Sequence, residues 1–343
     1  MLNSIHISAF STTKRVNHGG VRRSVQLSSL AVEQGRQITY PLENKVALRR
    51  AFFKPILVLK ALSLLSKIGP SRFTLKGLIV TISQCVWLLD LLKKNTSDNE
   101  IGIEIAPGRP MILAALLGVL GKKFVAYPHN VEFLVPGQVQ GIFSGPEQDY
   151  FIERFVYQSA KKVITISRFD AAVIKSMGVA KVAVLPYIPV SEFRDELLKI
   201  KEKRATTEKK GVLILGTVGN IPTREGVQNM LDMIAQNSLG IQFKLAGYGT
   251  EIFIDSSPAS LEVLGSVTKE VMFDLMSGCK CLLINQPQTS GMLTRIVEAE
   301  FVDIPVYVLS DYMQADDPSL RMTKRITSLS ALAELIGDDD KKF

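Results

Sequence analysis

Short apolar runs alternate with amphipathic stretches through the first half of the chain. Apolar runs typical of buried strands occur at 5–10, 37–40, 101–105, 123–127, 162–166 and 182–188. Helical spacing occurs between them at 21–34, 110–120, 150–160 and 168–177. This alternation is typical of a parallel sheet covered by helices on both faces. We therefore expect a doubly wound α/β domain.

The second half repeats the same rhythm. Strands are expected at 212–218, 241–246, 261–267, 279–285 and 305–309, with helices at 225–236, 269–276 and 292–301. Between the halves the composition changes to charge-dense helix formers, which fits a solvated linker or a solvated surface helix. The sequence predicts an N-terminal Rossmann-like domain over 1–190, a charged linker over 191–210 and a C-terminal Rossmann-like domain over 211–343.

Residues 47–94 have helical apolar spacing that is broken by Gly69 and Pro70. The most apolar part, 77–92, is interrupted by Ser83, Gln84 and Asp90, and we interpret it as a buried helix rather than a membrane span.

Composition narrows the choice of partner and compartment. A net charge of +8 in 343 residues indicates an anionic partner, such as nucleotide phosphates, acidic lipid or nucleic acid. The N-terminus lacks the features of a secretory signal, and Cys85, Cys279 and Cys281 lack the spacing of a metal knuckle. We expect buried, reduced thiols in a cytoplasmic protein.

The most informative segment runs from Ser290 to Val306. Gly291 lies at a predicted helix start, and the first two turns carry Thr294, Arg295 and Glu298. Unpaired amides at a helix start favour phosphate, a hydroxyl and a guanidinium add donors, and a carboxylate can accept from ribose hydroxyls.

This segment resembles the donor domain of nucleotide-sugar glycosyltransferases of the GT-B type, which belong to glycosyl transferases group 1 or are family 4-like. Glu298-Ala299 and Pro305-Val306 are in register with the family pattern, while Ser290 replaces its first glutamate and Leu293 its second glycine. Thr294-Arg295 is more similar to a related branch with a basic residue at this turn. The resemblance implies a donor site that includes Ser290, Gly291, Met292, Leu293, Thr294, Arg295 and Glu298.

Three further segments of the second half resemble the family in the same order. The resemblance implies that glycine-rich turns approach the donor, that a basic residue faces its phosphates, and that the loop after a later strand contacts the base. The residues in these places are Gly219, Asn220, Arg224, Gly247, Tyr248, Gly249 and Val267.

In the first half the resemblance is looser. Gly19 and Gly20 match a turn that faces the cleft, although an ordinary tight turn explains them equally well. His129 and Glu132 follow a predicted strand end, where the family carries a cleft-facing histidine, and the resemblance implies that they are catalytic. A structural histidine and an ordinary loop acid are the alternatives.

The family implies the GT-B architecture, two Rossmann-like domains facing each other across a cleft, and transfer from a UDP- or GDP-sugar to a glycan or lipid-linked acceptor, as in bacterial-type surface glycan assembly. We expect no cofactor, no metal requirement and no nucleic-acid partner. The alternative is a non-catalytic GT-B-like subunit, which Ser290 favours. A dehydrogenase would need a Gly-x-Gly-x-x-Gly motif, which is absent. A nucleotide-sugar epimerase on the same scaffold is a third option, which would require more convincing acid/base carboxylates.

Residues 45–67 interleave basic and bulky apolar side chains. Such a helix either lies in the interface of an anionic membrane or packs on the core with a solvated basic face. Because many relatives act on lipid-linked acceptors, we expect a peripheral position on the inner face of the membrane.

Overall fold

The computed structural model describes residues 4–10, 19–41, 53–69, 73–94, 100–135, 146–237 and 239–339, with the single positions 43, 46, 49 and 51. The chain forms two compact units. The N-terminal unit comprises Met1–Tyr187 with Ser290–Met292, and the C-terminal unit comprises Ile188–Thr289 with Leu293–Phe343.

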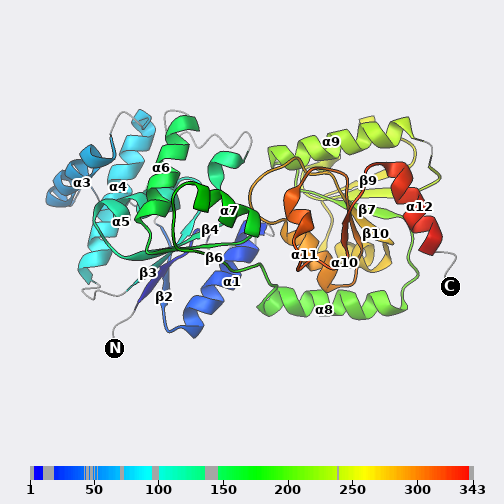
Figure 1. Cartoon of the computed structure of the whole chain (residues 1–343), viewed down its shortest axis with the longest axis horizontal. Coiled ribbons are helices and arrows are strands. Elements are labelled where there is room, and N and C mark those ends of the chain that lie inside the picture. The colour runs from blue at the N-terminus through cyan, green and yellow to red at the C-terminus, as the bar shows by residue number, and fades with distance from the viewer. Residues whose placement is uncertain are drawn as a thin grey trace. The chain divides into compact units, whose positions relative to one another are not determined.

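The N-terminal unit is built on a parallel sheet of six strands in the order β2-β1-β3-β4-β5-β6 (Figure 1). Phe124 and Ala126 pack into the main core, whereas Val125 and Tyr127 pack with Leu27 on the other face. Both faces of the sheet are therefore covered, which explains its nearly continuous apolar strands. The strands are β1 (Ile5–Ile7), β2 (Gln37–Thr39), β3 (Ile101–Ile105), β4 (Phe124–Pro128), β5 (Lys162–Thr165) and β6 (Val182–Val184).

Helices pack against this sheet and against each other, with α5 in contact with α3, α4 and α6. The short 3-10 helix η2 (Glu132–Leu134) follows β4. The helices are α1 (Gly19–Glu33), α3 (Pro55–Ile68), α4 (Leu75–Lys94), α5 (Arg109–Val119), α6 (Pro146–Ser159) and α7 (Arg168–Ser176).

Helix α4 is more apolar than a surface helix. Its segment Leu75–Lys93 has the length and hydropathy of a membrane-spanning helix, and half of that segment is buried inside the unit. Cys85 and Leu88 are fully buried, whereas Leu75 and Ile79 in the first turns are exposed. The expected buried helix is thus present, but its first two turns lie at the surface.

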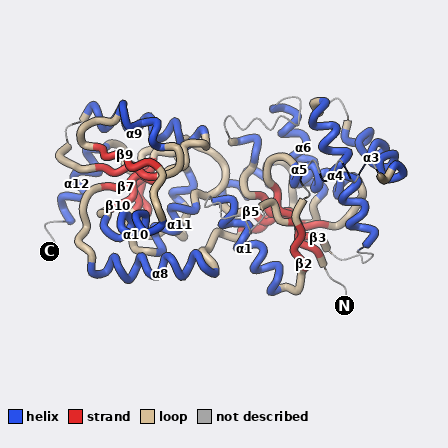
Figure 2. The backbone as a smooth tube through the Cα atoms, turned by 180° about the vertical axis from the view of Figure 1, so that it is seen from behind, coloured by secondary structure: helices blue, strands red, loops and turns tan. Residues whose placement is uncertain are grey.

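The C-terminal unit has a second parallel sheet of six strands in the order β12-β11-β10-β7-β8-β9. The chain order reverses between the neighbouring strands β7 and β10, and open α/β sheets bind ligands at such a switch point, beyond the carboxyl ends of the strands. Figure 2 shows the strands of each unit as one layer with helices around it. The strands are β7 (Val212–Leu215), β8 (Phe243–Ala246), β9 (Leu261–Gly265), β10 (Cys281–Ile284), β11 (Val306–Val308) and β12 (Thr323–Arg325).

The strand β12 and the helix α12 lie beyond the last element that the sequence predicts, the strand at 305–309. The three cysteines of the chain are buried and form no disulfide, as expected. The helices are α8 (Ser191–Thr206), α9 (Ile221–Gln236), α10 (Lys269–Gly278), α11 (Thr294–Phe301) and α12 (Leu329–Asp339), with 3-10 helices η3 (Thr250–Ser256) and η4 (Met313–Asp316).

Most of the segment 191–210, which the sequence predicts to be a charged linker, is the helix α8. Leu197 and Ile200 on α8 pack into the core of the C-terminal unit. The buried guanidinium of Arg204 donates to the carbonyl oxygens of Met276 and Cys279 at the end of α10, at 3.2 and 2.5 Å. The charge-dense segment is therefore part of the C-terminal unit, because its apolar residues and the Arg204 guanidinium pack inside that unit.

Candidate functional site

The loops after β7 and β8 lie against each other at the carboxyl edge of the C-terminal sheet. The Gly216 amide donates to the Ala246 carbonyl and the Val218 amide to the Tyr248 carbonyl, both at 3.1 Å. Gly247 has a φ of 143°, and a Cβ atom there would lie 1.8 Å from the Gly216 carbonyl oxygen. Only glycine fits at position 247, and the two loops therefore form one rigid floor.

Helix α9 starts directly beyond β7, with Asn220 as its N-cap residue and no hydrogen bond from the Asn220 side chain to the helix. A Cβ atom on Gly226 would lie 1.6 Å from the Asn285 carbonyl oxygen, so the helix backbone rests on the loop after β10. A Cβ atom on Gly219, in contrast, would meet nothing within 4 Å. Gly219 thus leaves open space beside the start of α9, which is a geometry that suits the approach of an anion.

Arg295 on α11 extends to the carboxyl edge of the C-terminal sheet, at the switch point between β7 and β10. Its Nη2 donates to the Oε1 of Gln286 at 3.2 Å, and the same oxygen accepts from the Thr223 hydroxyl at 3.3 Å. A Cβ atom on Gly216 would lie 3.9 Å from the Arg295 Nη1. Burial lowers the pKa of Arg295 to about 10, which leaves the guanidinium charged at neutral pH. Its Nε is buried and has no hydrogen-bond partner among the described residues.

The other donor residues expected in this unit lie on the same edge or next to it. Thr294 begins α11 and is buried, and Glu298 is buried one turn after Arg295. The Leu293 amide donates to the Tyr312 hydroxyl at 2.9 Å. Tyr248 is 71% exposed after β8. Arg224 is exposed on the first turn of α9, Gly249 lies at the start of η3, and Val267 follows β9.

Ser290, Gly291 and Met292 belong to the N-terminal unit. The Ser290 hydroxyl donates to Asp170 at 2.7 Å and accepts from the Val131 amide. The Gly291 amide donates to both oxygens of Asp170, at 3.1 and 3.2 Å. The polar groups of Ser290 and Gly291 that were expected to face the donor are engaged by protein groups in this structure.

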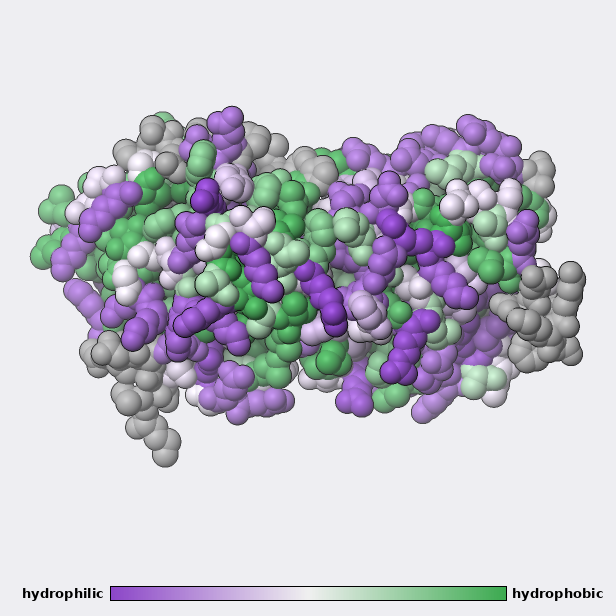
Figure 3. Space-filling view, viewed as in Figure 1, coloured by the Kyte–Doolittle hydropathy of each residue, from purple (hydrophilic) through white to green (hydrophobic). Residues whose placement is uncertain are grey.

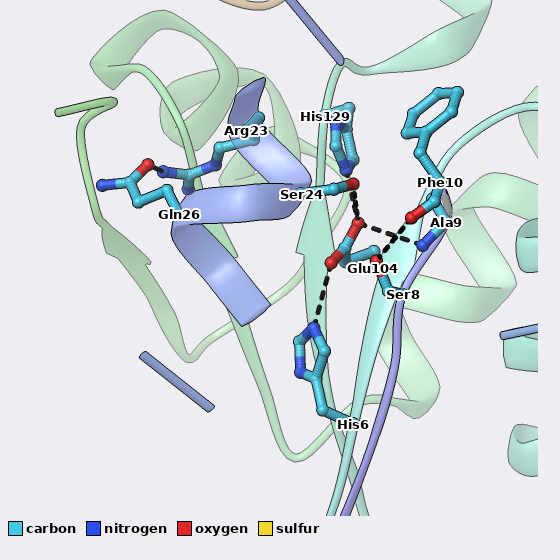
Figure 4. Close-up of polar contacts among 9 residues, drawn as sticks. All are labelled: His6, Ser8, Ala9, Phe10, Arg23, Ser24, Gln26, Glu104 and His129. Atoms are coloured by element: carbon cyan, nitrogen blue, oxygen red, sulfur yellow. Dashed lines mark hydrogen bonds and ion pairs between the residues drawn. The ribbon is translucent and has the colours of Figure 1, made fainter. Parts of the chain in front are cut away.

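The carboxyl edge of the N-terminal sheet holds a buried polar cluster centred on Glu104 of β3 (Figure 4). Glu104 accepts from the Nε2 atoms of His6 and His129, at 3.1 and 3.0 Å. It also accepts from the Ala9 amide at 3.0 Å and from the Ser24 hydroxyl. Burial alone would raise the pKa of Glu104, but hydrogen bonds from both histidines hold it well below the usual range of a glutamate. Glu104 is therefore ionised.

The sequence expectation included His129 but missed Glu104, His6 and Ser24. A usable signal was present, since Glu104 is the only charged residue in the strand Ile101–Ile105. A carboxylate inside a strand that is buried on both faces needs hydrogen-bond or charged partners. Because ligands of parallel sheets bind at the carboxyl ends of the strands, a polar cluster at that edge is a candidate functional site.

Glu132, the second residue expected to be catalytic, lies in η2 and is buried. Its carboxylate interacts with the side chain of Asn130. Burial raises the pKa of Glu132 well above the ordinary value, and the charge of Glu153 adds to this rise. Burial thus favours the protonated form of Glu132, and in that form the side chain can donate a proton.

Gly19 and Gly20 form the first two positions of α1 and are partly exposed. The preceding residues Asn17 and His18 lie outside the described residues. Within the described ranges, no group of three His, Cys, Asp or Glu side chains has an arrangement that could hold a metal ion.

No protein-family model matches the sequence, and neither does any curated protein. Solved structures do match the fold. HepE of Anabaena, in complex with UDP and glucose, superposes with a TM-score of 0.58 at 12% identity over 98% of this chain and 89% of that chain. Sucrose-phosphate synthase from Thermosynechococcus elongatus superposes with a TM-score of 0.54 at 13% identity, over 76% and 69% of the two chains.

The catalytic domain of starch synthase IV from Arabidopsis thaliana, bound to ADP and acarbose, has a TM-score of 0.50 at 11% identity over 78% of this chain and 72% of that chain. With two Rossmann-like sheets of six strands each, the chain has the GT-B fold that its sequence predicts.

Proposed function

We propose that this chain is a glycosyltransferase that moves a sugar from a UDP- or GDP-linked donor, held by the C-terminal unit, to a glycan or lipid-linked acceptor. One observation carries the proposal: a charged, largely buried arginine, Arg295, lies beside the glycine Gly216 at the switch point of a Rossmann-like sheet. A fixed cation beside the open start of a helix is a site for a diphosphate.

The neighbouring structures support this direction, because HepE was crystallised with UDP and glucose and starch synthase IV with ADP. In our proposal the diphosphate lies over Gly219 and the start of α9, with Arg295 and Thr294 as donors. Glu298 accepts from the ribose, and Tyr248 and Val267 lie near the base. His129 and Glu132 act on the transferred sugar or on the acceptor.

The test is nucleoside diphosphate binding by the full chain. A thermal-shift panel with UDP, GDP, TDP and CMP should raise the melting temperature for one diphosphate, because a ligand that binds only the folded state stabilises it. Calorimetry with Arg295→Gln should then show a loss of about 1.5 to 3 kcal/mol in binding, the size of a charge-assisted contact. Arg321→Gln is the matched control, since Arg321 is exposed at the start of β12, on the opposite edge of the sheet. Equal affinity in the two variants would exclude Arg295 from the site.

A non-catalytic nucleotide-binding subunit remains the second candidate, because Ser290 stands where the family carries a glutamate and its hydroxyl is engaged by Asp170. Slow donor hydrolysis by the purified chain distinguishes the two functions. Nucleotide binding without hydrolysis or transfer would favour the subunit.

We also propose that α3 and the start of α4 dock on an anionic membrane, which places a cytoplasmic enzyme near a lipid-linked acceptor. Ile56 and Leu59 on α3 are 70% and 67% exposed, and Leu75 on α4 is 78% exposed. Figure 3 shows apolar side chains gathered over α3, at the left end of the view. Exposed apolar residues in such numbers are typical of an interaction surface.

Basic residues accompany the apolar ones on these helices. Lys60, Lys67 and Lys76 are exposed, and neither α3 nor the first turn of α4 contains an acidic residue. Lys54 in contrast is paired with Asp90 at 2.6 Å, so it contributes less to the surface charge. Lys45 and Arg50, which the sequence expectation included, lie outside the described residues. The arrangement suits shallow insertion combined with headgroup attraction.

A further inference from the structure

The amino edge of the N-terminal sheet carries a row of exposed lysines. Lys123 directly precedes β4, Lys161 precedes and Lys162 begins β5, and Lys181 precedes β6. These three strands are neighbours in the sheet, and the Val163 amide donates to the Lys181 carbonyl at 2.9 Å. Because adjacent strands lie about 4.8 Å apart, the row places its positive charges close together.

A hollow of about 430 Å³ opens at this edge, between the ends of α5 and α6. A Cβ atom on Gly118 would lie 2.8 Å from the Ser159 Cβ, so the two helix ends are in close contact there. A Cβ atom on Gly121, in contrast, would meet nothing within 4 Å. Lysines make up half of the main lining residues, which are Gly118, Gly121, Lys122, Lys123, Ser159 and Lys161.

The turn that carries Lys122 is held by backbone hydrogen bonds. The Gly121 amide donates to the Gly118 carbonyl and the Lys122 amide to the Leu117 carbonyl, both at 3.0 Å. Gly121 has a φ of 64°, the left-handed conformation in which many helices end. These two amides are therefore engaged within the turn, and the lysine side chains are the groups available to a ligand.

The acid Glu100, which directly precedes β3, already serves two cations. Its Oε1 accepts from the Nη2 of Arg36 at 3.3 Å, and its Oε2 accepts from the Nζ of Lys161 at 2.6 Å. Within the described ranges, neither Lys122 nor Lys123 forms an ion pair. Positive charge therefore exceeds negative charge around the hollow. Like charges on neighbouring strands repel each other, and an anion between them would relieve that repulsion.

The helix dipole does not account for these lysines. A cation stabilises the C-terminal end of a helix when it lies within the last turn. The last turns of α5 and α6 contain no basic residue, and Lys162 and Lys181 lie at strand starts. The row is thus not a complement to the helix ends.

We propose that this hollow binds a small phosphate-bearing anion with two or more negative charges, at the sheet edge opposite to the polar cluster centred on Glu104. Lysine binds phosphate as a point charge, without the planar fork that arginine presents. No residue that lines the hollow is aromatic, so the site offers no surface on which a base stacks. The ligand class is therefore pyrophosphate-like, either as a free anion or as the phosphate of an acidic lipid headgroup. The inference does not depend on the proposed transferase function.

Calorimetry with pyrophosphate at low salt tests the site in the full chain. The double variant Lys122→Gln with Lys123→Gln should bind at least about tenfold more weakly, the loss expected when contacts to a charged group are removed. Lys60→Gln with Lys67→Gln removes the same charge from exposed positions on α3 and should keep the wild-type affinity. Equal affinity in the two double variants, or no binding by the wild type, would overturn the proposal.

Glu100→Gln should change the affinity in the opposite direction. The substitution removes a negative charge beside the hollow and releases Lys161 from its ion pair. We expect pyrophosphate to bind about two- to fivefold more tightly, the size of an exposed ion-pair effect. Weaker binding by Glu100→Gln would overturn the assignment of the lysines as ligands.

Arg295→Gln separates this site from the proposed donor site, which also takes a diphosphate. Pyrophosphate binding that survives Arg295→Gln and is lost in the double variant of Lys122 and Lys123 belongs to the hollow. If the wild type binds pyrophosphate in this way but no nucleoside diphosphate, the proposed function fails and the hollow stands.

Vesicle flotation distinguishes the two sources of phosphate. Phosphatidylcholine vesicles that contain phosphatidic acid present a phosphate monoester at their surface. If the hollow binds a headgroup, the double variant of Lys122 and Lys123 should float less than the wild type. If it binds a free anion, the same variant should float like the wild type while its affinity for pyrophosphate falls. No effect of the variant in either measurement would overturn the proposal.

Discussion

The α carbon of Gly247 faces the carbonyl oxygen of Gly216 so closely that a Cβ atom there would lie 1.8 Å from that oxygen. Gly247→Ala must therefore separate the loops after β7 and β8 or strain the backbone. We expect a loss of about 2 to 4 kcal/mol in stability together with loss of nucleotide binding. Chemical denaturation followed by circular dichroism measures the first and calorimetry the second.

Gly219→Ala is the control for this substitution, because a Cβ atom at position 219 meets nothing within 4 Å. Its melting temperature should match that of the wild type, while nucleotide affinity falls if the diphosphate approaches this loop as proposed. Equal stability of the two variants would contradict the role of Gly247 in joining the loops.

Arg204 is expected to be a main source of stability in the C-terminal unit. Arg204→Met would leave the carbonyl oxygens of Met276, Cys279 and Asp303 without this donor, at a cost of about 2 to 4 kcal/mol. The neighbouring Lys203→Met removes only an exposed ion pair with Asp274 and should cost less than about 1 kcal/mol.

The single tryptophan separates the two units in this measurement. Trp87 is buried in the core of the N-terminal unit, so its fluorescence reports that unit. Arg204→Met should lower the denaturant concentration at which circular dichroism first detects unfolding. The denaturant concentration at which Trp87 fluorescence changes should stay the same. If only the Trp87 transition moved to lower denaturant, Arg204 would stabilise the N-terminal unit and the assignment would be wrong.

The buried acids around η2 predict that the N-terminal unit is most stable at mildly acidic pH. Burial raises the pKa of Glu153 to about 7 and that of Asp149 to about 6, and it raises the pKa of Glu132 as well. An acid with a raised pKa binds its proton more tightly in the folded state. Stability should therefore fall as pH rises from about 4.5, the ordinary carboxyl value, through about 7.

Glu132→Gln tests this expectation because it removes the titrating group with almost no change in the size of the side chain. The variant should match the wild type near pH 5 and exceed its stability at pH 8, as measured by Trp87 fluorescence in urea. Glu147→Gln, which neutralises an exposed acid on α6, should leave the profile nearly unchanged. A wild type that gains stability between pH 5 and 8 would contradict the assignment.

Membrane docking predicts a specific pattern of vesicle flotation. Binding to vesicles that contain phosphatidylglycerol should weaken with salt, and each of Lys60→Glu and Lys67→Glu should remove about 1 kcal/mol or more. Ile56→Ser with Leu59→Ser should weaken binding at all salt concentrations, because it removes the inserted apolar area. Ile252→Ser in the C-terminal unit, where Ile252 is 60% exposed, is the matched control. Equal flotation with neutral and acidic vesicles would contradict docking by charge.

The strands and most helices were predictable because a parallel sheet needs apolar runs of defined length and helical spacing between them. The segment 191–210 shows where this reasoning fails. Its charge density is typical of solvent exposure, and nothing local indicates that Arg204 turns inward to the end of α10, which lies about 70 residues further along the chain. Glycine pairs were found as turns, but the contact of Gly247 with Gly216 depends on β7 and β8 being neighbours in the sheet.

The cluster in the N-terminal unit could not be assembled from the sequence for a similar reason. His6, Glu104 and His129 come together because β1 and β4 both flank β3, with His6 in register with Gly102 and Glu104 in register with Tyr127. The sequence indicated only that His129 follows a strand. Pairing across 98 residues is set by the order of strands, which local patterns do not contain.

The strand order also constrains how the chain reaches its folded state. Every strand pairing in the described part of the chain is parallel, so neither sheet can begin as a hairpin. β1 cannot pair with β3 until the intervening α3 and α4 have been synthesised, whereas β3 and β4 are joined by α5 alone. Pairing of β3 with β4 closes the shorter loop, and closure of long loops is entropically costly. We expect pulse-labelled hydrogen exchange to protect β3 and β4 before β1, with its partner β2, joins the centre of the sheet.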